Sequence, residues 1–419
     1  MKELIQRKTS PATILWSKNF FLLLLGNFFV YQGILMLIPT FPVYIKQLGG
    51  NDLQASLPFA VVSISALIVR AISGNAADTF GRRPLLILGM GILLLFNGSY
   101  YLASGIGIIL MLRFAQGIGW GMTSTVLATI MSDIVPPARR GEGTGYFALS
   151  IILGTSLATV AGIEAMKRYN FDSILLISTL LVGAGMLLTQ GISLAPVKKI
   201  AKVKRASGIV WSDLVEKSAV LPAFLCFLHS ITFGGIMSFI MLFGQEAGIE
   251  NVGIYFVGHV LMILISRPFA GKLFDRKGHA FVIIPGVLLM MVGLLMLSYA
   301  NSVYFLVAAS LCYGLGYGAA HPSLQAWAIQ RSPAERRGAA NGTFLSSLDL
   351  GYAVGAVLLG LIATHTNYAV MYRISVLFLA AFAGIYGYHL VKTRQYNRNL
   401  QREEIMETET GDDGEAQLA

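Results

Sequence analysis

The chain contains 419 residues, of which 55% are apolar and only 12% are charged. Soluble globular domains carry roughly 25% charged residues, so this composition excludes an ordinary soluble protein. A bilayer-spanning helix needs about 20 apolar residues, and the apolar content is sufficient for around twelve such spans. The formal net charge of +10 would be typical of a nucleic-acid-binding protein in a soluble chain, but in a membrane protein it is first a topology signal.

Apolar stretches of spanning length follow one another along the chain and predict helices, because unpaired backbone groups cannot face lipid. They lie at residues 20–45, 54–77, 84–103, 106–132, 143–166, 173–195, 219–245, 251–271, 280–300, 303–329, 339–364 and 368–391. The expected fold class is an all-α membrane protein with twelve transmembrane helices. The first stretch is too long for the apolar part of a secretory signal, so we expect it to remain as an uncleaved span.

The spans divide the chain into two halves, residues 1–195 and 219–391, joined by a basic linker over residues 196–218. The linker alternates basic and apolar residues, which is typical of a solvated cytoplasmic segment or of an amphipathic helix at the membrane surface. Sensing of anionic lipid is the functional alternative for it. The tail over residues 392–419 becomes acidic after Arg402 and is expected to be a disordered cytoplasmic segment.

The distribution of basic residues predicts the orientation of the spans. The side that holds both termini carries 24 of the 31 lysines and arginines, whereas the opposite loops hold only Lys46, Lys167 and Arg168. Cytoplasmic loops are enriched in lysine and arginine, so both termini are predicted to be cytoplasmic. The same asymmetry accounts for the net charge without a nucleic-acid partner. We therefore expect a multi-pass protein of the cell (plasma) membrane.

The two halves repeat one another at an offset of 197 residues. Three pairs of segments share this register: 70–81 with 267–278, 117–121 with 314–318, and 140–147 with 337–344. The first pair conserves one spacing of residue types, given by Arg70, Gly74, Asp78 and Gly81 and again by Arg267, Gly271, Asp275 and Gly278. An even number of spans per half makes the repeats parallel. Membrane transporters built from parallel repeats bind substrate near the midplane between the halves. The glycine pairs are expected to allow close helix packing.

These motifs resemble those of the major facilitator superfamily. Residues 74–84 are similar to the family's loop motif between spans 2 and 3, and residues 271–279 are similar to its weaker copy between spans 8 and 9. Residues 113–121 resemble a span 4 motif of the proton-driven exporters. The resemblance implies two parallel six-helix halves and the export of a small organic compound in exchange for protons. Residues 154–159 lack the Gly-Pro pair that drug exporters of this family usually carry in span 5.

Ionisable side chains inside spans are costly, so each is a candidate for function. Asp349 lies near the midplane of span 11, where it is expected to bind and release a proton or to tie neighbouring helices together by hydrogen bonds. Arg113, about seven residues into span 4, is expected to tune that site or to bind an anionic group of the substrate. The other candidates for the central cavity are Gln116, Asn27, Gln32, His229, His259 and His321, for which packing is the alternative role.

The repeated loop motif is expected to act as a cytoplasmic latch rather than as a substrate site. Asp78 is placed to accept hydrogen bonds from the start of span 11 near Gly338, and Arg82 is placed to reach Asp133 at the end of span 4. Anchoring of the loops is the alternative role. The remaining members of this candidate gate are Gly74, Gly81, Arg267, Gly271, Asp275 and Gly278.

No cofactor is expected other than a proton gradient. Cys226 and Cys312 form no CxxC pair and the histidines show no H-x3-H spacing, so no metal site is expected. The sequence lacks a G-x4-G-K-[ST] loop, which argues against a fused ATPase, and no enzyme is expected. The expected partners are a small-molecule substrate and the lipid bilayer, with the protein monomeric. A facilitator, or an importer of a sugar or another small metabolite, is the alternative function.

Overall fold

A computed structural model describes residues 15–103, 105–136, 139–194, 215–333 and 336–416 of the chain. Within these residues, twelve segments are long and apolar enough to cross a membrane, as the sequence predicts. The helices are α2 (Lys18–Leu35), α3 (Thr40–Gln47), α4 (Asp52–Phe80), α5 (Arg82–Ser99), α6 (Ile106–Ile134), α7 (Arg140–Arg168), α8 (Phe171–Gln190), α10 (Val220–Glu246), α11 (Ile254–Lys277), α12 (Ala280–Ser298), α13 (Val303–Gln330), α14 (Arg337–His365) and α15 (Tyr368–Ala416).

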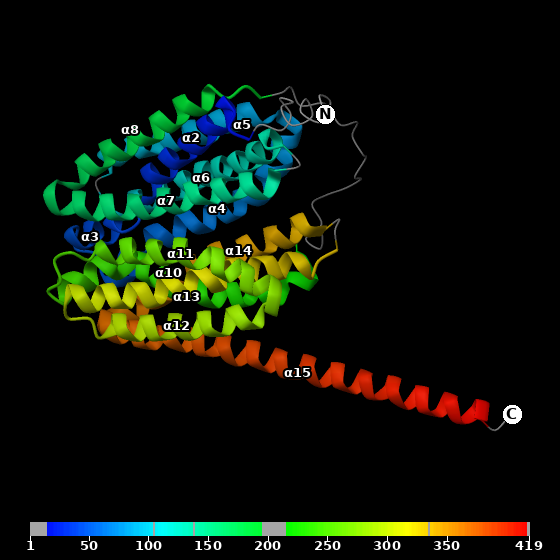
Figure 1. Cartoon of the computed structure of the whole chain (residues 1–419). Coiled ribbons are helices and arrows are strands. Elements are labelled where there is room, and N and C mark those ends of the chain that lie inside the picture. The colour runs from blue at the N-terminus through cyan, green and yellow to red at the C-terminus, as the bar shows by residue number, and fades with distance from the viewer. Residues whose placement is uncertain (1–14, 104, 137–138, 195–214, 334–335, 417–419) are drawn as a thin grey trace.

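The helices form two bundles, one made of α2 to α8 and the other of α10 to α15, which lie side by side with their long axes in similar directions (Figure 1). We call the end of the molecule where the described chain stops at residue 194 and resumes at residue 215 the linker end, and the opposite end the far end. One cluster of buried apolar side chains includes residues of both bundles, whereas a second lies within the first bundle.

The two bundles are joined at the far end by a group of polar contacts that we call the far-end seal. The Tyr368 hydroxyl donates a hydrogen bond to Asp52, which also forms an ion pair with Lys46 at 2.8 Å. The Lys167 ammonium donates to the Asn251 side-chain oxygen at 3.1 Å. Because Asp52 and Lys167 belong to the first bundle and Tyr368 and Asn251 to the second, these bonds hold the bundles together at this end.

The first span is broken where the sequence predicts one continuous helix. The stretch expected over residues 20–45 consists of α2 and α3, which are separated by four residues that end at Pro39. Proline has no backbone N–H and its ring disfavours a helix in the preceding turns. The break is stabilised by the Thr40 hydroxyl, which donates to the carbonyl of Leu37 at 3.0 Å.

The repeat read from the sequence is present in the packing of the helices. A Cβ atom on Gly117 would lie 2.6 Å from the carbonyl oxygen of Val62, and one on Gly314 would lie 2.5 Å from that of His259, which is 197 residues after Val62. The two loop glycines also match, since Gly81 has φ 96° and Gly278 has φ 82°. Glycine is favoured there because a side chain is strained at positive φ. Each half therefore reproduces the same backbone contacts.

The C-terminal tail differs from the expectation of disorder over residues 392–419. Helix α15 continues without interruption to Ala416. Residues 393–410 contain neither glycine nor proline and are rich in glutamine, glutamate and arginine, which are strong helix formers, and the preceding part of the helix supplies a nucleus for extension. Most of the linker predicted over residues 196–218 lies outside the described residues, as do residues 417–419.

Candidate functional site: the interface between the bundles

An ion pair joins the two bundles near the middle of the helices. Asp349, the thirteenth residue of α14, places its Oδ2 atom 3.2 Å from Nη2 of Arg70 in α4. The contact is one of charge rather than a well-formed hydrogen bond, because Oδ2 has no hydrogen-bond partner among the described residues. Both side chains are about one-fifth exposed, at 24% for Arg70 and 17% for Asp349. The carboxylate expected at the midplane is therefore present at the interface, with a cationic partner from the other half.

Aromatic rings surround this ion pair from both bundles. Tyr31 of α2 lies close enough to Arg70 and Asp349 for their charges to interact with its hydroxyl, and its ring packs edge-on against Trp120 at 4.7 Å. On the other side, Phe59 of α4 stacks on Tyr352 of α14 at 5.9 Å. Tyr31 and Tyr352 thus bring aromatic rings from both bundles close to Asp349, where a change in the charge of one member of the pair has a large effect on the other.

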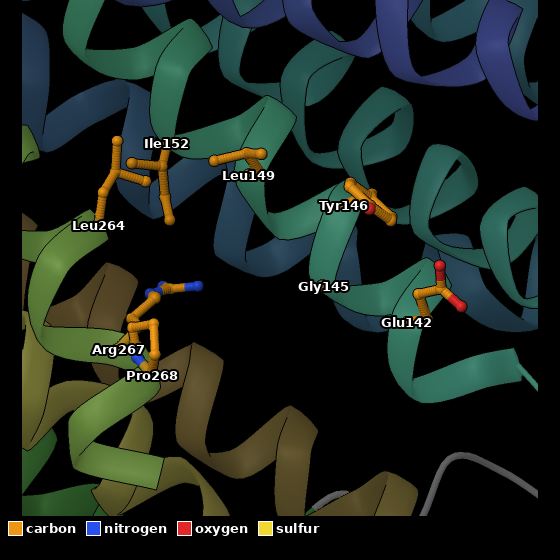
Figure 2. Close-up of a pocket in the computed structure, with 8 residues that line it drawn as sticks. All are labelled: Glu142, Gly145, Tyr146, Leu149, Ile152, Leu264, Arg267 and Pro268. Carbon is orange, nitrogen blue, oxygen red and sulfur yellow. The ribbon is translucent and has the colours of Figure 1, made fainter. Parts of the chain in front are cut away.

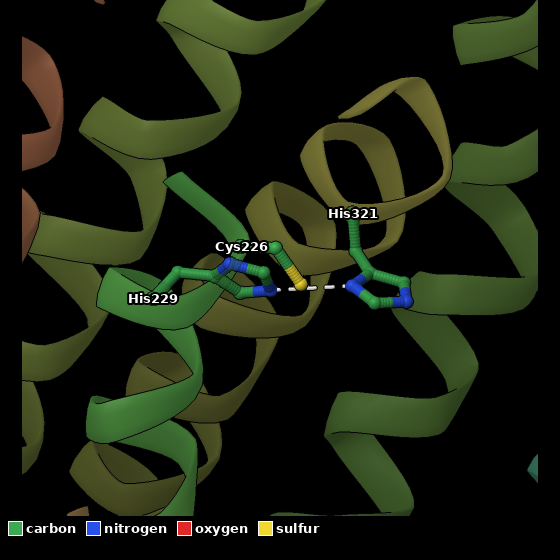
Figure 3. Close-up of side chains that lie close together, drawn as sticks. All are labelled: Cys226, His229 and His321. Carbon is green, nitrogen blue, oxygen red and sulfur yellow. Dashed lines mark hydrogen bonds between the residues drawn. The ribbon is translucent and has the colours of Figure 1, made fainter. Parts of the chain in front are cut away.

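Two of the histidine candidates come together in the second bundle. Nε2 of His229 in α10 lies 3.2 Å from Nδ1 of His321 in α13, and Figure 3 shows the Cys226 sulfur beside this contact. The ligand atoms of these three side chains all lie within 4.8 Å of one another. Nδ1 of His229 contacts the carbonyl of Leu225 at 3.3 Å, which orients the ring. Three donors of this kind suit a soft metal ion with one open position.

His259, the third histidine candidate, lies apart from this pair. Its two ring nitrogens are buried and have no hydrogen-bond partner among the described residues. The ring stacks on Phe233 at 5.2 Å, and Phe233 is also 5.2 Å from Tyr317. The Tyr317 hydroxyl lies 3.2 Å from that of Tyr352. The second bundle therefore presents a continuous set of packed aromatic side chains that extends to Tyr352 at the interface.

Arg113 and Gln116 lie inside the first bundle. Nη1 of Arg113 donates to Oε1 of Gln116 at 2.6 Å, and the guanidinium carbon is 3.8 Å from the ring centre of Phe41. Gln116 donates in turn to Asn97, whose amide donates to the Ser178 hydroxyl at 2.8 Å. These bonds connect α5, α6 and α8. The contacts described for Arg113 and Gln116 thus belong to one bundle, and the structure does not bring them to the ion pair.

The polar candidates of the first span also differ from one another in position. Asn27 is fully buried, and its amide donates to the Ser150 hydroxyl of α7 at 2.9 Å, within the first bundle. Gln32 is half-buried. Only Gln32 therefore keeps an exposed polar surface among the amides predicted for span 1.

A cavity of about 340 Å³ lies between α7 and α11 and extends toward the linker end (Figure 2). Arg267 of α11 is its basic residue, and Glu142 of α7 is its acidic residue. Arg267 also lies close enough to Tyr317 and His321 for charge interaction. The remaining lining is mostly apolar and consists of Gly145, Tyr146, Leu149, Ile152, Leu264 and Pro268. Its size is within the range of roughly 300–1,000 Å³ that small-molecule sites occupy.

The loops at the linker end contain one of the contacts expected for a latch. Nε of Arg82 donates to Oδ2 of Asp133 at 3.0 Å. Asp275 is exposed, whereas the Asp78 side chain lies outside what the structure describes, so its expected contact near Gly338 is left as a prediction. Arg267 is not in the loop, because it lies within α11 and faces the cavity. Gly74 and Gly271 lie near the ends of α4 and α11, a few residues before the loop glycines.

A second polar cluster at the linker end connects the start of the second bundle to α14. Arg336 donates to the carboxylate of Glu216, which also accepts a hydrogen bond from the Ser218 hydroxyl at 2.8 Å. The hydrogen bonds from Arg336 and Ser218 lower the pKa of Glu216 to about 2. Glu216 is therefore charged at neutral pH, and the ion pair is formed.

Sequence reasoning missed Arg70 as the partner of Asp349 and Arg267 as a residue of the cavity. Both arginines stand at the same position of the repeat, eleven residues before a loop glycine. Eleven residues of helix correspond to about 16 Å, which places a side chain well inside the membrane span rather than in the loop. The separation of eleven residues from the loop glycine could therefore have shown that both arginines lie inside their spans.

Twelve apolar segments in two repeated bundles, with ionisable groups gathered between them, define a multi-pass membrane transport protein. The sequence profile of the Major Facilitator Superfamily matches residues 23–265 and 251–409, and the chain belongs to this family. An uncharacterised MFS-type transporter of Methanocaldococcus jannaschii is 24% identical over 381 residues, which cover 88% of this chain and 97% of the relative.

Relatives with named functions cover the chain to a similar extent. The multi-drug resistance efflux pump PmrA homolog of Lactococcus lactis is 24% identical over 85% of this chain and 91% of its own length. Multidrug resistance protein MdtG of Citrobacter koseri is 23% identical over 92% of this chain and 98% of its own length. Among solved structures, nucleoside transporter NupG has a TM-score of 0.67 at 15% identity, with 88% of this chain and 98% of that chain covered. The human organic anion transporter MFSD10 has a TM-score of 0.67 at 15% identity, with 90% of this chain and 100% of that chain covered. These two likenesses show the major facilitator fold.

Proposed function

We propose that this transporter exports a small organic compound in exchange for protons by alternating access. The observation that carries the proposal is the ion pair between Arg70 and Asp349, because it joins the two bundles near the middle of the membrane. When Asp349 is charged, it attracts Arg70 and favours contact between α4 and α14. When it is protonated, that attraction is lost. Proton binding therefore changes the relative energy of two arrangements of the bundles, which is the requirement for coupling.

The proposed orientation follows from the basic residues of the loops. The linker end is cytoplasmic, because 24 of the 31 lysines and arginines lie in segments on that side. The cavity between α7 and α11 then opens toward the cytoplasm, while the far-end seal closes the other side. The conformation is thus the inward-facing state of an exporter that takes its substrate from the cytoplasm or the inner membrane leaflet. The protein acts in the cell membrane as a monomer and does not convert its substrate chemically.

Export rather than uptake is supported by the relatives that carry multidrug resistance names and match more than four-fifths of the chain. The loops at the linker end are proposed to latch the opposite state, in which the cytoplasmic side is closed. The bond between Arg82 and Asp133 lies within the first bundle, where it holds the loop after α4 against the end of α6 and so keeps the loop in place for such a latch. Asp78 is proposed to complete the latch against the start of α14.

The substitution Asp349→Asn tests the proposal, because it removes the titratable group and keeps the size of the side chain. A transported compound is first identified by comparing the small molecules retained by cells with and without the protein. In proteoliposomes, the variant should lose accumulation driven by a pH gradient while it keeps substrate exchange in the absence of a gradient. Asp172→Asn, which changes an exposed carboxylate at the far end, is the matched control. Undiminished gradient-driven accumulation by Asp349→Asn would remove this residue from the coupling mechanism.

A further inference from the structure

The two halves repeat their arginine but not its acidic partner. Arg267 in α11 stands 197 residues after Arg70 in α4, and α14 is related to α7 by the same offset. The residue of α7 that corresponds to Asp349 is therefore Ile152. One interface between the bundles, α4 with α14, has an arginine and a carboxylate. The other, α7 with α11, has an arginine that faces an isoleucine.

The structure shows that this correspondence holds in space. Ile152 and Arg267 both line the cavity of about 340 Å³, and Figure 2 shows the Arg267 guanidinium directed from α11 toward the side of α7 that carries Ile152. Nε of Arg267 is buried and has no hydrogen-bond partner among the described residues. Beside this arginine, the place that Asp349 takes at the other interface is thus held by the apolar Ile152, with the cavity next to it.

The acidic residue of the cavity does not compensate this charge. Glu142 forms an ion pair with Arg139 at 2.7 Å, and in Figure 2 its carboxylate lies toward the linker end, away from Arg267. Among the described residues, the titratable groups that interact with Arg267 include Tyr317 and His321, neither of which is an anion at neutral pH, and no ion pair to Arg267 is formed. Arg113 also has no carboxylate partner within the described part of the chain, but it is fully buried and rests on Phe41. A guanidinium within a membrane span without an anionic partner is costly, which favours an anion that arrives with the substrate.

We propose that the cavity binds an organic anion whose carboxylate pairs with Arg267 next to Ile152, and this rests on the proposed transport function. The planar guanidinium donates in a fork that matches the two oxygens of a carboxylate. Leu149, Leu264 and Pro268 contact the apolar body of such a compound. The bound substrate supplies the carboxylate that the second half lacks, so the loaded transporter has an arginine–carboxylate pair at both bundle interfaces.

Binding without any gradient is the first test, with protein in lipid nanodiscs and 1-naphthylacetate as the probe. Its uncharged analogue 1-naphthylacetamide has the same apolar body. We expect the acid to bind more tightly than the amide. Arg267→Gln should lower the affinity for the acid by about tenfold to a hundredfold and leave the affinity for the amide unchanged. Arg267→Lys keeps the charge but not the fork of donors, so it should weaken binding of the acid less than Arg267→Gln does. Equal binding of acid and amide, or an acid affinity unaffected by Arg267→Gln, overturns the proposal.

A second test supplies the missing carboxylate from the protein. Ile152→Asp should reproduce the pair of Arg70 and Asp349 at the other interface, raise the unfolding temperature relative to Ile152→Asn, and abolish binding of 1-naphthylacetate. Ile152→Asn is the matched control, because it has the same size without the charge. If the two variants have the same unfolding temperature and both bind the acid, Arg267 does not accept a carboxylate at this position and the inference is wrong.

These measurements are independent of coupling. Loss of gradient-driven transport in Asp349→Asn together with equal binding of acid and amide would leave the transport proposal intact and reject the anion site. Selective binding of the acid through Arg267, together with unaltered gradient-driven transport by Asp349→Asn, would support the anion site and reject the proton coupling.

Discussion

The first and second bundles have the same glycine contacts but different interiors. In the first bundle, Arg113 is held by hydrogen-bonding amides and hydroxyls and by a ring contact to Phe41. In the second bundle, Tyr317 stacks on His321, and the ring of His229 packs against both at a tilt. The repeat preserves glycine at the positions where backbones approach closely, because no residue with a side chain fits there. The interior between those positions has diverged, so that polar hydrogen bonds fill one bundle where aromatic rings fill the other.

The largest effect is expected at the shared glycines. A Cβ atom on Gly117 would lie 1.8 Å from the Ser65 hydroxyl and 2.6 Å from the Val62 carbonyl oxygen, and one on Gly314 would lie 2.5 Å from the His259 carbonyl oxygen. Backbone atoms of this kind cannot move aside. Gly117→Leu and Gly314→Leu should each cost about 3 kcal/mol or more of stability. The measurement is the yield and unfolding temperature of detergent-purified protein. Gly91→Leu is the control, since nothing lies within 4 Å of its Cβ position. If only one of the two substitutions lowers the yield and the unfolding temperature, the halves do not share this packing.

A smaller effect is expected from the polar support of the first bundle. Arg113→Gln removes the contact with the Phe41 ring, and Phe41→Leu removes it from the other side. A double-mutant cycle of the two should give a coupling energy of about 0.5–2 kcal/mol in the free energy of unfolding, measured in mixed detergent and SDS. Because Arg113 has its contacts within one bundle, Arg113→Gln should slow transport without removing its response to a pH gradient. A coupling energy of zero would mean that the ring does not stabilise the guanidinium.

The smallest effect concerns two related arginines at the linker end. Arg336 pairs with Glu216 of another element, whereas Arg139, its counterpart 197 residues earlier, pairs with Glu142 of the adjacent helix turn. Glu216→Gln should lower the unfolding temperature at pH 7 by more than Glu142→Gln, since i,i+3 pairs stabilise a helix weakly.

The pH dependence of this effect has a definite sign. The pKa of Glu216 is lowered from 4.5 to about 2 in the folded protein, so its pair stabilises the fold above about pH 4.5 and the stabilisation is lost as the pH falls toward 2. The difference in unfolding temperature between the unmodified protein and Glu216→Gln should therefore narrow between pH 4.5 and pH 3. A difference that stays constant over this range would show that Glu216 does not act through its charge.

The fold could be predicted from the sequence because its causes are local or periodic. Runs of about 20 apolar residues define the spans, and the repeat of 197 residues defines the halves. The break before Thr40 and the extension of α15 were not predicted, because window hydropathy is insensitive to Pro39 and charged composition does not distinguish a disordered tail from a long exposed helix.

The candidate site was predicted only in part, because it is assembled from helices distant in the chain. Asp349 stood out as a carboxylate in an apolar span, but its partner Arg70 precedes it by 279 residues. The cluster of Cys226, His229 and His321 has the same origin, since spacing along one helix cannot show that α10 and α13 bring their histidines within 3.2 Å. Pairing each residue with its counterpart in the other half would have revealed the contrast between Asp349 and Ile152.

In the far-end seal, Asp52 contacts both Lys46 and Tyr368. In the proposed alternating-access cycle, outward opening requires the contact with Tyr368 and the bond between Lys167 and Asn251 to break, so these bonds would help to set the fraction of molecules that are open at the linker end at rest. A ligand that enters from the linker end binds only that fraction, and its apparent dissociation constant equals the intrinsic value divided by the fraction. The affinity measured from one side of the membrane is therefore determined in part by a tyrosine and an aspartate on the other side.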